Sequence, residues 1–422
     1  MKGRAQSRET YDRGAPVLIL KMKDAAFHHG ALGIIRSFGR LGVPVYCSTE
    51  TRAAPAARSR YLAKPAFPVL DAGDRTQRLE AMKAFQDAVG RPMVVIPVDD
   101  KGALFLAENA EALRPRFLLP PQKADLPRAA ASKADHGRLF GKTGVQTPAT
   151  WVIRRLEDLD AAGPAYPVVV KIAQPWLLPP KALPAFLARK REDVAAYFLA
   201  VKAAKDADVI VQEYIPDPFA EDWFYHACCD EHGAPLVAFT GRKFRSYPAF
   251  FGATSYGVSL VNPEVLAIGE TLLRALGYAG IVELEFRFDR RDGRHLLIDF
   301  NPRPGAQFQF LRNEAGVDVV RALHLNLTGR PVPAGRQVEH VAFVGDFTDF
   351  AALHAYRCTG HVRARQWLRQ YLGAQERAWL AWDDPGPFAA ACGLQWKAYA
   401  AARRAGAVIP LWKRHAPDGR AP

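Results

Sequence analysis

The chain has 422 residues, which at roughly 150 residues per domain suggests about two or three domains. Hydrophobic residues make up 49% and charged residues 24% of the sequence, so a fibre or a wholly disordered chain is excluded. No apolar run approaches the ~20 residues of a membrane-spanning helix. The five cysteines lack CxxC spacing, so we expect a reduced, cytoplasmic setting.

The formal net charge is +14, from 57 Lys and Arg against 43 Asp and Glu. From residue 351 onward eleven basic residues stand against four acidic ones, so half of the excess lies in this last part. A solvated basic helix surface would explain it. The alternative is an acidic partner such as a nucleotide, an anionic lipid or RNA.

The first part of the chain alternates strands and helices. Residues 17–20 (VLIL) predict a buried strand, residues 30–42 a helix, and residues 43–49 and 93–99 two further strands. This order predicts a parallel sheet with helices on its faces. The spacing GALG does not match GxGxxG, so it predicts no dinucleotide site.

A proline-rich stretch, residues 113–127, reads as a linker, and we place a domain boundary near residue 125. Beyond it the pattern predicts a helix over 132–144, extended chain over 147–153, strands over 166–172 and 208–215, and a helix over 191–205. After residue 331 helices are expected. Their four tryptophans are interpreted as packing residues: Trp367, Trp379, Trp382 and Trp396.

Two strands further along the chain carry regularly spaced acids. In GIVELEFRFD and HLLIDFN apolar residues alternate with polar ones, the period of a strand with one buried face. A three-residue loop, Arg291 to Gly293, would pair Glu285 with Asp299 across the hairpin, with glycine in the left-handed conformation. Two acids facing each other across a ladder repel, so a cation is expected there.

Carboxylate oxygens on adjacent strands suit Mg²⁺, and Arg303 just past the strand end could brace a phosphoryl oxygen. The alternative is a solvated strand face closed by an Asn-Pro turn.

With these residues in place, the chain resembles the ATP-grasp enzymes, close to the carboxylate-amine ligases that include D-aspartate ligase-like proteins. The resemblance covers roughly residues 15 to 330 and implies an α/β protein. It implies a Rossmann-like domain (15–125) followed by a two-subdomain α+β ATP-grasp domain (126–330). A mostly helical C-terminal extension (331–422) lies outside it.

The resemblance also assigns site residues. It implies Mg²⁺ or Mn²⁺ held by Glu285, Asp299 and Asn301, where Asp299 stands in place of the usual Glu. It implies ATP contacts from the residues that match the family's nucleotide positions: Lys133, Lys171, Glu213, Tyr214, Ile215 and Glu221, with Asp222 an alternative to Glu221. In GRKFRSYPAFFGATSYG it implies Lys243 and Arg245 as cations near the γ-phosphate and the acyl group, alongside Arg303.

One departure concerns the phosphate flap. The glycine-rich flap that often follows the lysine corresponding to Lys171 is absent from QPWLLPPKALP, so Lys181 or a backbone loop would have to close over the phosphates.

The function implied is ATP-dependent joining of a carboxylate to an amine or thiol through an acyl phosphate, with release of ADP and phosphate. The alternatives are an ATP-grasp carboxylase or kinase-like phosphoryl transferase and, from another class, a non-catalytic nucleotide-binding or basic surface-binding protein. The expected partners are small-molecule substrates. Homo-oligomers fit this interpretation, whereas nucleic acid is disfavoured.

Overall fold

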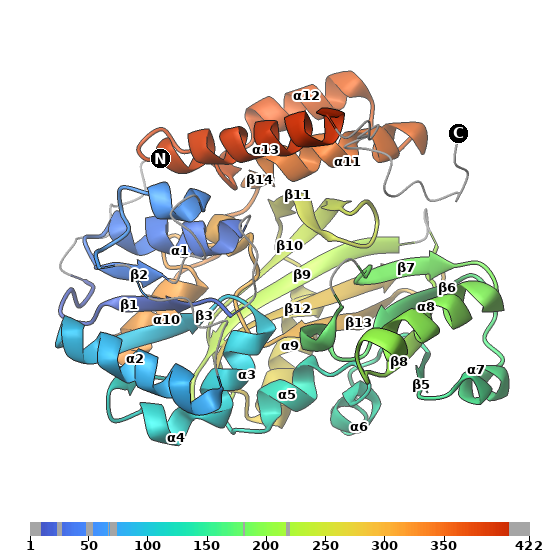
Figure 1. The fold of residues 1–422 in the computed structure, drawn as a ribbon, viewed down its shortest axis with the longest axis horizontal. Helices are drawn as coiled ribbons and strands as arrows, with labels where there is room; N and C mark the ends of the chain where they lie inside the picture. The colour runs from blue at the N-terminus through green and yellow to red at the C-terminus, as the bar shows by residue number, and fades with distance from the viewer. Residues whose placement is uncertain are drawn as a thin grey trace.

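A computed structural model describes residues 10–22, 28–47, 54–65, 67, 74–179, 182–216 and 220–404. Three sheets organise this part of the chain (Figure 1). None of its helices is both long and apolar enough to cross a membrane.

The first sheet is parallel, with strand order β2-β1-β3-β4. Its central strand VLIL is fully buried, as expected for a parallel strand covered on both faces. The predicted strand and helix alternation is confirmed, but β4 falls within the stretch expected to be a linker. The elements are β1 (Val17–Leu20), α1 (His29–Gly39), β2 (Val45–Cys47), η1 (Pro55–Arg58), α2 (Arg75–Val89), β3 (Met93–Pro97), α3 (Asp100–Glu108), α4 (Ala110–Leu113) and β4 (Phe117–Leu118).

The GALG spacing in α1 serves close packing. A Cβ on Gly30 would lie 2.9 Å from the Cα of Ala306, and one on Gly33 would lie 2.8 Å from the Gln309 side chain. Helix α1 therefore packs directly against residues 306 to 309, which follow the predicted hairpin that carries the acids. This contact joins the first sheet to the third.

The second sheet is antiparallel, with order β5-β8-β6-β7, and α8 packs on it. The helix predicted over 132–144 is wrong in extent, because only His136–Phe140 form an α-helix there. The Lys133 N–H instead donates to the Ala173 carbonyl at 2.8 Å, which ties this segment to the end of β6. The elements are α5 (Leu126–Ala131), α6 (His136–Phe140), β5 (Thr150–Ile153), α7 (Leu156–Ala162), β6 (Val168–Ile172), η2 (Pro175–Leu177), β7 (Ala185–Ala188), α8 (Arg191–Ala204) and β8 (Val209–Glu213).

The third sheet has seven strands in the order β13-β12-β9-β10-β11-β14-β15. Helices α9 and α10 pack on it, and its apolar faces carry much of the buried core, including Phe224, Phe300 and Phe343. The elements before the extension are β9 (Ala220–Cys229), β10 (Pro235–Tyr247), β11 (Ala253–Ser259), α9 (Pro263–Leu276), β12 (Gly280–Asp289), β13 (Arg294–Asn301), η3 (Phe308–Phe310) and α10 (Val319–Leu327).

The β12–β13 hairpin has the predicted pairing and a different loop. Glu285 lies opposite Asp299, and Gly293 has the predicted left-handed conformation with φ 74°. The last pair is Asp289 with Arg294, so the loop has four residues and the predicted three-residue loop is wrong. One extra residue in β13, Ile298, forms a bulge that compensates for the longer loop and restores the predicted pairing.

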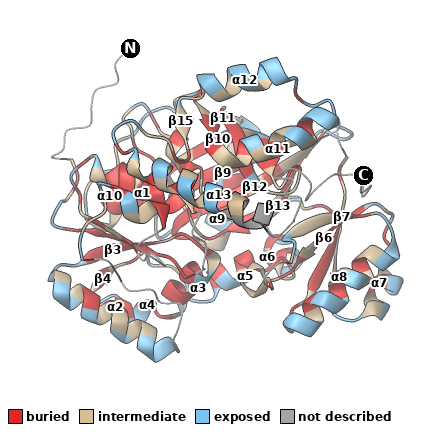
Figure 2. Ribbon diagram, turned by 45° about the horizontal axis from the view of Figure 1, so that its top comes forward, coloured by how far each residue is buried: buried red, intermediate tan, exposed pale blue. Residues whose placement is uncertain are grey.

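The extension is helical as predicted, and it also adds two short strands to the large sheet. Its helices lie along one side of that sheet, above β10 and β11 (Figure 1), and α12 is mostly exposed (Figure 2). Trp379 is buried and Trp367 partly buried, in agreement with a packing role, whereas Trp382 and Trp396 are exposed. The elements are β14 (Ala342–Val344), α11 (Asp346–Cys358), α12 (Ala364–Gly373), β15 (Glu376–Arg377) and α13 (Gly386–Arg404).

Candidate active site

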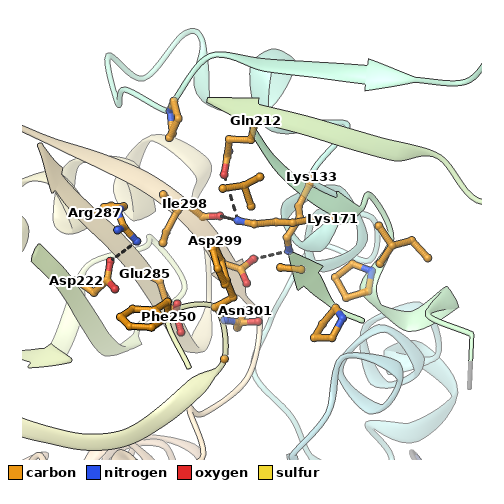
Figure 3. A pocket seen from close by; sticks show the side chains of 18 of the residues that line it. Lys133, Lys171, Gln212, Asp222, Phe250, Glu285, Arg287, Ile298, Asp299 and Asn301 are labelled. Carbon is orange, nitrogen blue, oxygen red and sulfur yellow. Dashed lines mark hydrogen bonds and ion pairs between the residues drawn. The ribbon is translucent and has the colours of Figure 1, made fainter. Parts of the chain in front are cut away.

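A cavity of about 260 Å³ lies between the second and third sheets (Figure 3). Ten of the twelve side chains predicted from the sequence line it. They come from the segment before α6, from β6, from the end of β8, and from β10, β12 and β13: Lys133, Lys171, Glu213, Tyr214, Ile215, Lys243, Glu285, Asp299, Asn301 and Arg303. Residues more than 150 positions apart in the sequence thus line the same cavity.

Lys171 reaches the cavity because β6 alternates. Val170 and Ile172 point into the core of the small sheet, and the lysine between them points the other way. Its Nζ donates to the Gln212 side chain at 3.1 Å and to the Ile298 carbonyl at 3.5 Å. Desolvation lowers the pKa of Lys171 to about 8, although the nearby Asp299 acts in the opposite direction.

Lys133 and Asp299 form an ion pair across the cavity, with 2.6 Å between Nζ and Oδ1. Burial alone would raise the pKa of Asp299. The charges of Lys133 and Lys171 outweigh that effect and hold the pKa well below its ordinary value. Asp299 is therefore a carboxylate at neutral pH.

Lys243 and Glu285 form a second ion pair, with 2.8 Å between Nζ and Oε2. Burial raises the pKa of Glu285; Lys243 opposes this shift, and the nearby Glu283 and Asp299 act in the same direction as burial. Burial would lower the pKa of Lys243, but the charges of Glu285 and Asp222 raise it. A cation was expected near the facing acids Glu285 and Asp299. Lys243 and Lys133 supply part of this positive charge.

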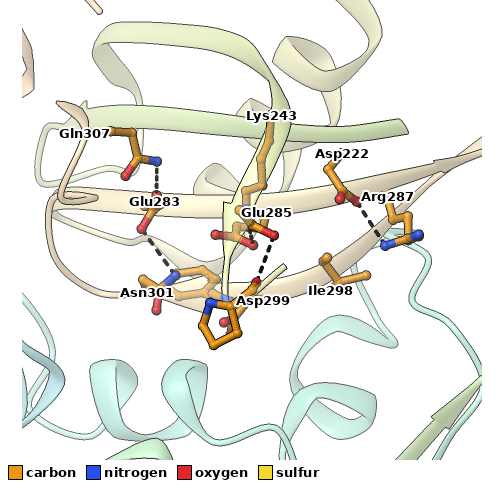
Figure 4. A network of polar contacts seen from close by, with 12 residues as sticks. Asp222, Lys243, Glu283, Glu285, Arg287, Ile298, Asp299, Asn301 and Gln307 are labelled. Atoms are coloured by element: carbon orange, nitrogen blue, oxygen red, sulfur yellow. Dashed lines mark hydrogen bonds and ion pairs between the residues drawn. The ribbon is translucent and has the colours of Figure 1, made fainter. Parts of the chain in front are cut away.

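Behind this wall a buried network centres on Glu283 (Figure 4). Glu283 Oε1 lies 3.2 Å from His226 Nε2 and accepts from Gln307 Nε2 at 2.7 Å, while Oε2 accepts from Asn301 and Arg303 at 3.4 Å each. Burial opposes ionisation of Glu283, but His226, Arg303 and Lys243 outweigh it and lower its pKa. The network fixes the directions of Asn301 and Arg303.

Two predicted residues lie elsewhere. Arg245 is buried against the extension, where Nε and Nη2 donate to Asp349 at 2.8 and 2.9 Å. Lys243 and Arg245 would share a face in a regular strand, but Phe244 is an extra residue in β10 and shifts the alternation by one. Glu221 is paired with Arg290 and Arg242 outside the cavity. The neighbouring Asp222, the alternative considered from the sequence, lines the cavity instead.

Several lining residues were not assigned from the sequence. Asp100, at the start of α3, holds Arg303 at 3.1 Å, and Arg287 holds Asp222 at 3.3 Å. Arg287 alternates with Glu283 and Glu285 along β12, which is the signal that could have found it. Nothing local marks Asp100, which precedes Arg303 by 203 residues in the chain. Lys181, considered for closure over the phosphates, lies outside the described residues.

The donor set fits a magnesium nucleotide. The oxygens of Glu285, Asp299 and Asn301 are hard ligands on neighbouring strands, of the kind Mg²⁺ takes together with phosphates and waters. Lys133 and Lys171 supply charges that could meet those phosphates. In the described ranges no group of three or more His, Cys, Asp and Glu side chains is arranged to hold a metal ion by itself.

No protein-family model matches the chain, and no curated protein matches it in sequence. Among solved structures, N5-carboxyaminoimidazole synthetase from Staphylococcus aureus complexed with ADP is similar at TM-score 0.57 and 12% identity, over 82% of this chain and 86% of that one. An L-amino acid ligase from Bacillus licheniformis gives 0.57 and 15%, over 78% and 80%.

The biotin carboxylase domain of Hydrogenobacter thermophilus 2-oxoglutarate carboxylase, in complex with MgADP, ADP and bicarbonate, gives TM-score 0.54 and 17% identity, over 76% and 71%. At these identities the similarity establishes the fold. The chain has the ATP-grasp fold, with an N-terminal Rossmann-like domain and a helical C-terminal extension.

Proposed function

We propose that the protein is an ATP-dependent ligase that activates a carboxylate as an acyl phosphate and passes the acyl group to an amine, releasing ADP and phosphate. One observation carries this proposal. Lys171 of the second sheet and Lys133, in the segment tied to the end of β6, face carboxylates of the third sheet across a single cavity, with Arg303 also in its lining. Positioning and charge neutralisation are what phosphoryl transfer requires, and no protein nucleophile is needed.

The residues divide the work by their positions. Lys171 and Lys133 would hold the phosphates, and the strand end Glu213 to Ile215 would hold the base, where backbone groups suffice. Mg²⁺, held by Glu285, Asp299 and Asn301, would neutralise charge on the transferring phosphoryl group when bound. Arg303, held in place by Asp100 and Glu283, points its guanidinium at the same region and would stabilise the charge that builds up on the phosphoryl oxygens.

The names of similar structures support a carboxylate as the group that accepts the phosphoryl group. The similar structures include an L-amino acid ligase, an N5-carboxyaminoimidazole synthetase and a biotin carboxylase domain in complex with bicarbonate. An amino acid or another small carboxylate is thus the class of substrate to test first, with a small amine as the acceptor.

The test is a screen of pairs of amino acids and small amines for Mg²⁺-dependent ADP release, followed by mass measurement of the product. A condensed product, heavier than either substrate alone and lighter than their sum by one water, would support the ligase. ADP release that requires bicarbonate, or a stable phosphorylated product, would favour the carboxylase or kinase instead. Nucleotide binding without turnover over the whole screen would contradict both.

A further inference from the structure

The loop between β10 and β11 forms the wall of the cavity beside Glu285. Phe250, Phe251 and Gly252 line it, and Figure 3 shows Phe250 next to Glu285 and Asn301. Phe250 has φ 70°, a conformation that bulky side chains rarely adopt. Such a conformation persists only where the surroundings enforce it.

Helix α11 of the extension supplies those surroundings. The Tyr356 hydroxyl accepts hydrogen bonds from the backbone N–H groups of Ser246 at 3.0 Å and Phe250 at 3.2 Å. The rings of Phe250 and Tyr356 also pack, with their centroids 4.6 Å apart. Tyr356 is only 5% exposed, so the cavity wall and the extension share one small core.

The same helix holds both strands that carry the loop. Asp349 is fully buried and accepts from Arg245 on β10 and, at 3.0 Å, from the Ser255 hydroxyl on β11. Each of these strands has an extra residue here, Phe244 and Ser255, which turns the loop toward α11. Charge-assisted bonds thus fix the base of the loop, while Tyr356 fixes its tip.

We propose that Tyr356 is a positioning residue, which through Phe250 sets the cavity wall that selects the acyl or amine substrate. This inference rests on the proposed ligase function for its kinetic consequence. The extension would then contribute to substrate selection without contacting substrate. Nucleotide binding depends on other walls of the cavity and should not involve Tyr356.

The test is Tyr356→Phe, which keeps the ring and removes the hydroxyl, with Tyr371→Phe as the control on α12. Tyr371 contacts Asp346 and Arg377 and lies outside the cavity lining. For the best pair found in the ADP-release screen, Tyr356→Phe should raise the KM of one substrate roughly fivefold or more, as expected when the hydroxyl that accepts from Ser246 and Phe250 is lost. The kcat, the KM for MgATP and the Kd for MgADP should stay within about twofold of wild type, and Tyr371→Phe should change none of them.

Hydrogen exchange measured by mass spectrometry tests the same idea without turnover. Peptides covering 245–252 should exchange faster in Tyr356→Phe and at the wild-type rate in Tyr371→Phe. If no ligase activity is found, faster exchange confined to this loop still supports the positioning role while the proposed function fails. Unchanged exchange, an equal rise over the whole chain, or a KM that does not move would overturn the inference.

Discussion

Asp299 interacts with charged residues on both sides of the cavity. It accepts from Lys133, lies opposite Glu285, and has its pKa held low by two lysines. Asp299→Asn keeps the size and removes the charge, so it should lower Mg²⁺-dependent ADP formation roughly 100-fold or more. The fold should survive, because the side chain remains 27% exposed.

ADP release and a circular dichroism melting curve measure the two effects. Asp206→Asn is the matched control, since that side chain is 96% exposed and far from the cavity lining. Wild-type turnover in Asp299→Asn would remove this carboxylate from the site.

The lowered pKa of Lys171, about 8, predicts a pH dependence of binding. A phosphate bound beside Lys171 would favour the protonated lysine, so the nucleotide complex would hold a proton that the free protein loses as pH rises above 8. Affinity for MgADP should therefore be constant below about pH 7.5 and fall by up to tenfold per pH unit above pH 8.

Calorimetric titrations with MgADP between pH 6.5 and pH 9.5 measure this. Lys171→Arg keeps its charge throughout that range and should bind with a flat profile. A falling profile of equal slope in Lys171→Arg would assign the titration to another group.

At the scale of elements, β10 packs against α11 and directs two cations that are close in the sequence to different surroundings. Lys243 faces the cavity, and Arg245 faces Asp349 with a side chain only 4% exposed. Arg245→Met would leave Asp349 buried without its charged partner, which costs about 3–5 kcal/mol of unfolding free energy for buried pairs of this kind. Binding of MgADP should persist in the folded fraction.

Urea unfolding measures the stability of each variant and MgADP titration measures its nucleotide binding, so together they distinguish the roles of Lys243 and Arg245. Lys243→Met should show the opposite pattern, with turnover lost and a smaller change in stability. Equal stability of Arg245→Met and wild type would mean that the ion pair between Arg245 and Asp349 does not form in solution.

At the scale of the molecule, net charge and the cavity lead to different expectations. If the protein is a nucleotide enzyme, MgADP at a hundred times its Kd should stabilise the folded state by about 2.7 kcal/mol. The +14 charge alone would instead favour binding to RNA or anionic vesicles that weakens steeply with salt. Melting curves with MgADP, with RNA and with vesicles at 50 and 300 mM salt distinguish the two, and a shift with RNA alone would contradict the nucleotide site.

Much of this architecture follows from patterns of short range. Apolar runs predict the parallel strands, alternation predicts the carboxylate hairpin, and the family resemblance brings together ten side chains that line one cavity. The ladder position of Glu285 and Asp299 is predicted correctly, although the loop that was expected to set it has one more residue.

The remaining features depend on packing that no local pattern reports. The extra residue at Phe244 reverses the side of Arg245, a backbone hydrogen bond to Ala173 keeps Lys133 out of a helix, and Asp100 comes to Arg303 from the start of helix α3. The strands β14 and β15 have three and two residues, too short for periodicity to mark them.

The bulge at Ile298 affects how the cavity would respond to an insertion or deletion in β13. A bulge sends two successive side chains to the same face, and both Ile298 and Asp299 line the cavity. It also leaves the Ile298 carbonyl available to Lys171 on the other sheet. A protein lacking Ile298 would thus keep Glu285 opposite the aspartate but lose an apolar side chain from the cavity lining, so an insertion or deletion at this point can change the shape of the cavity without separating its charged side chains.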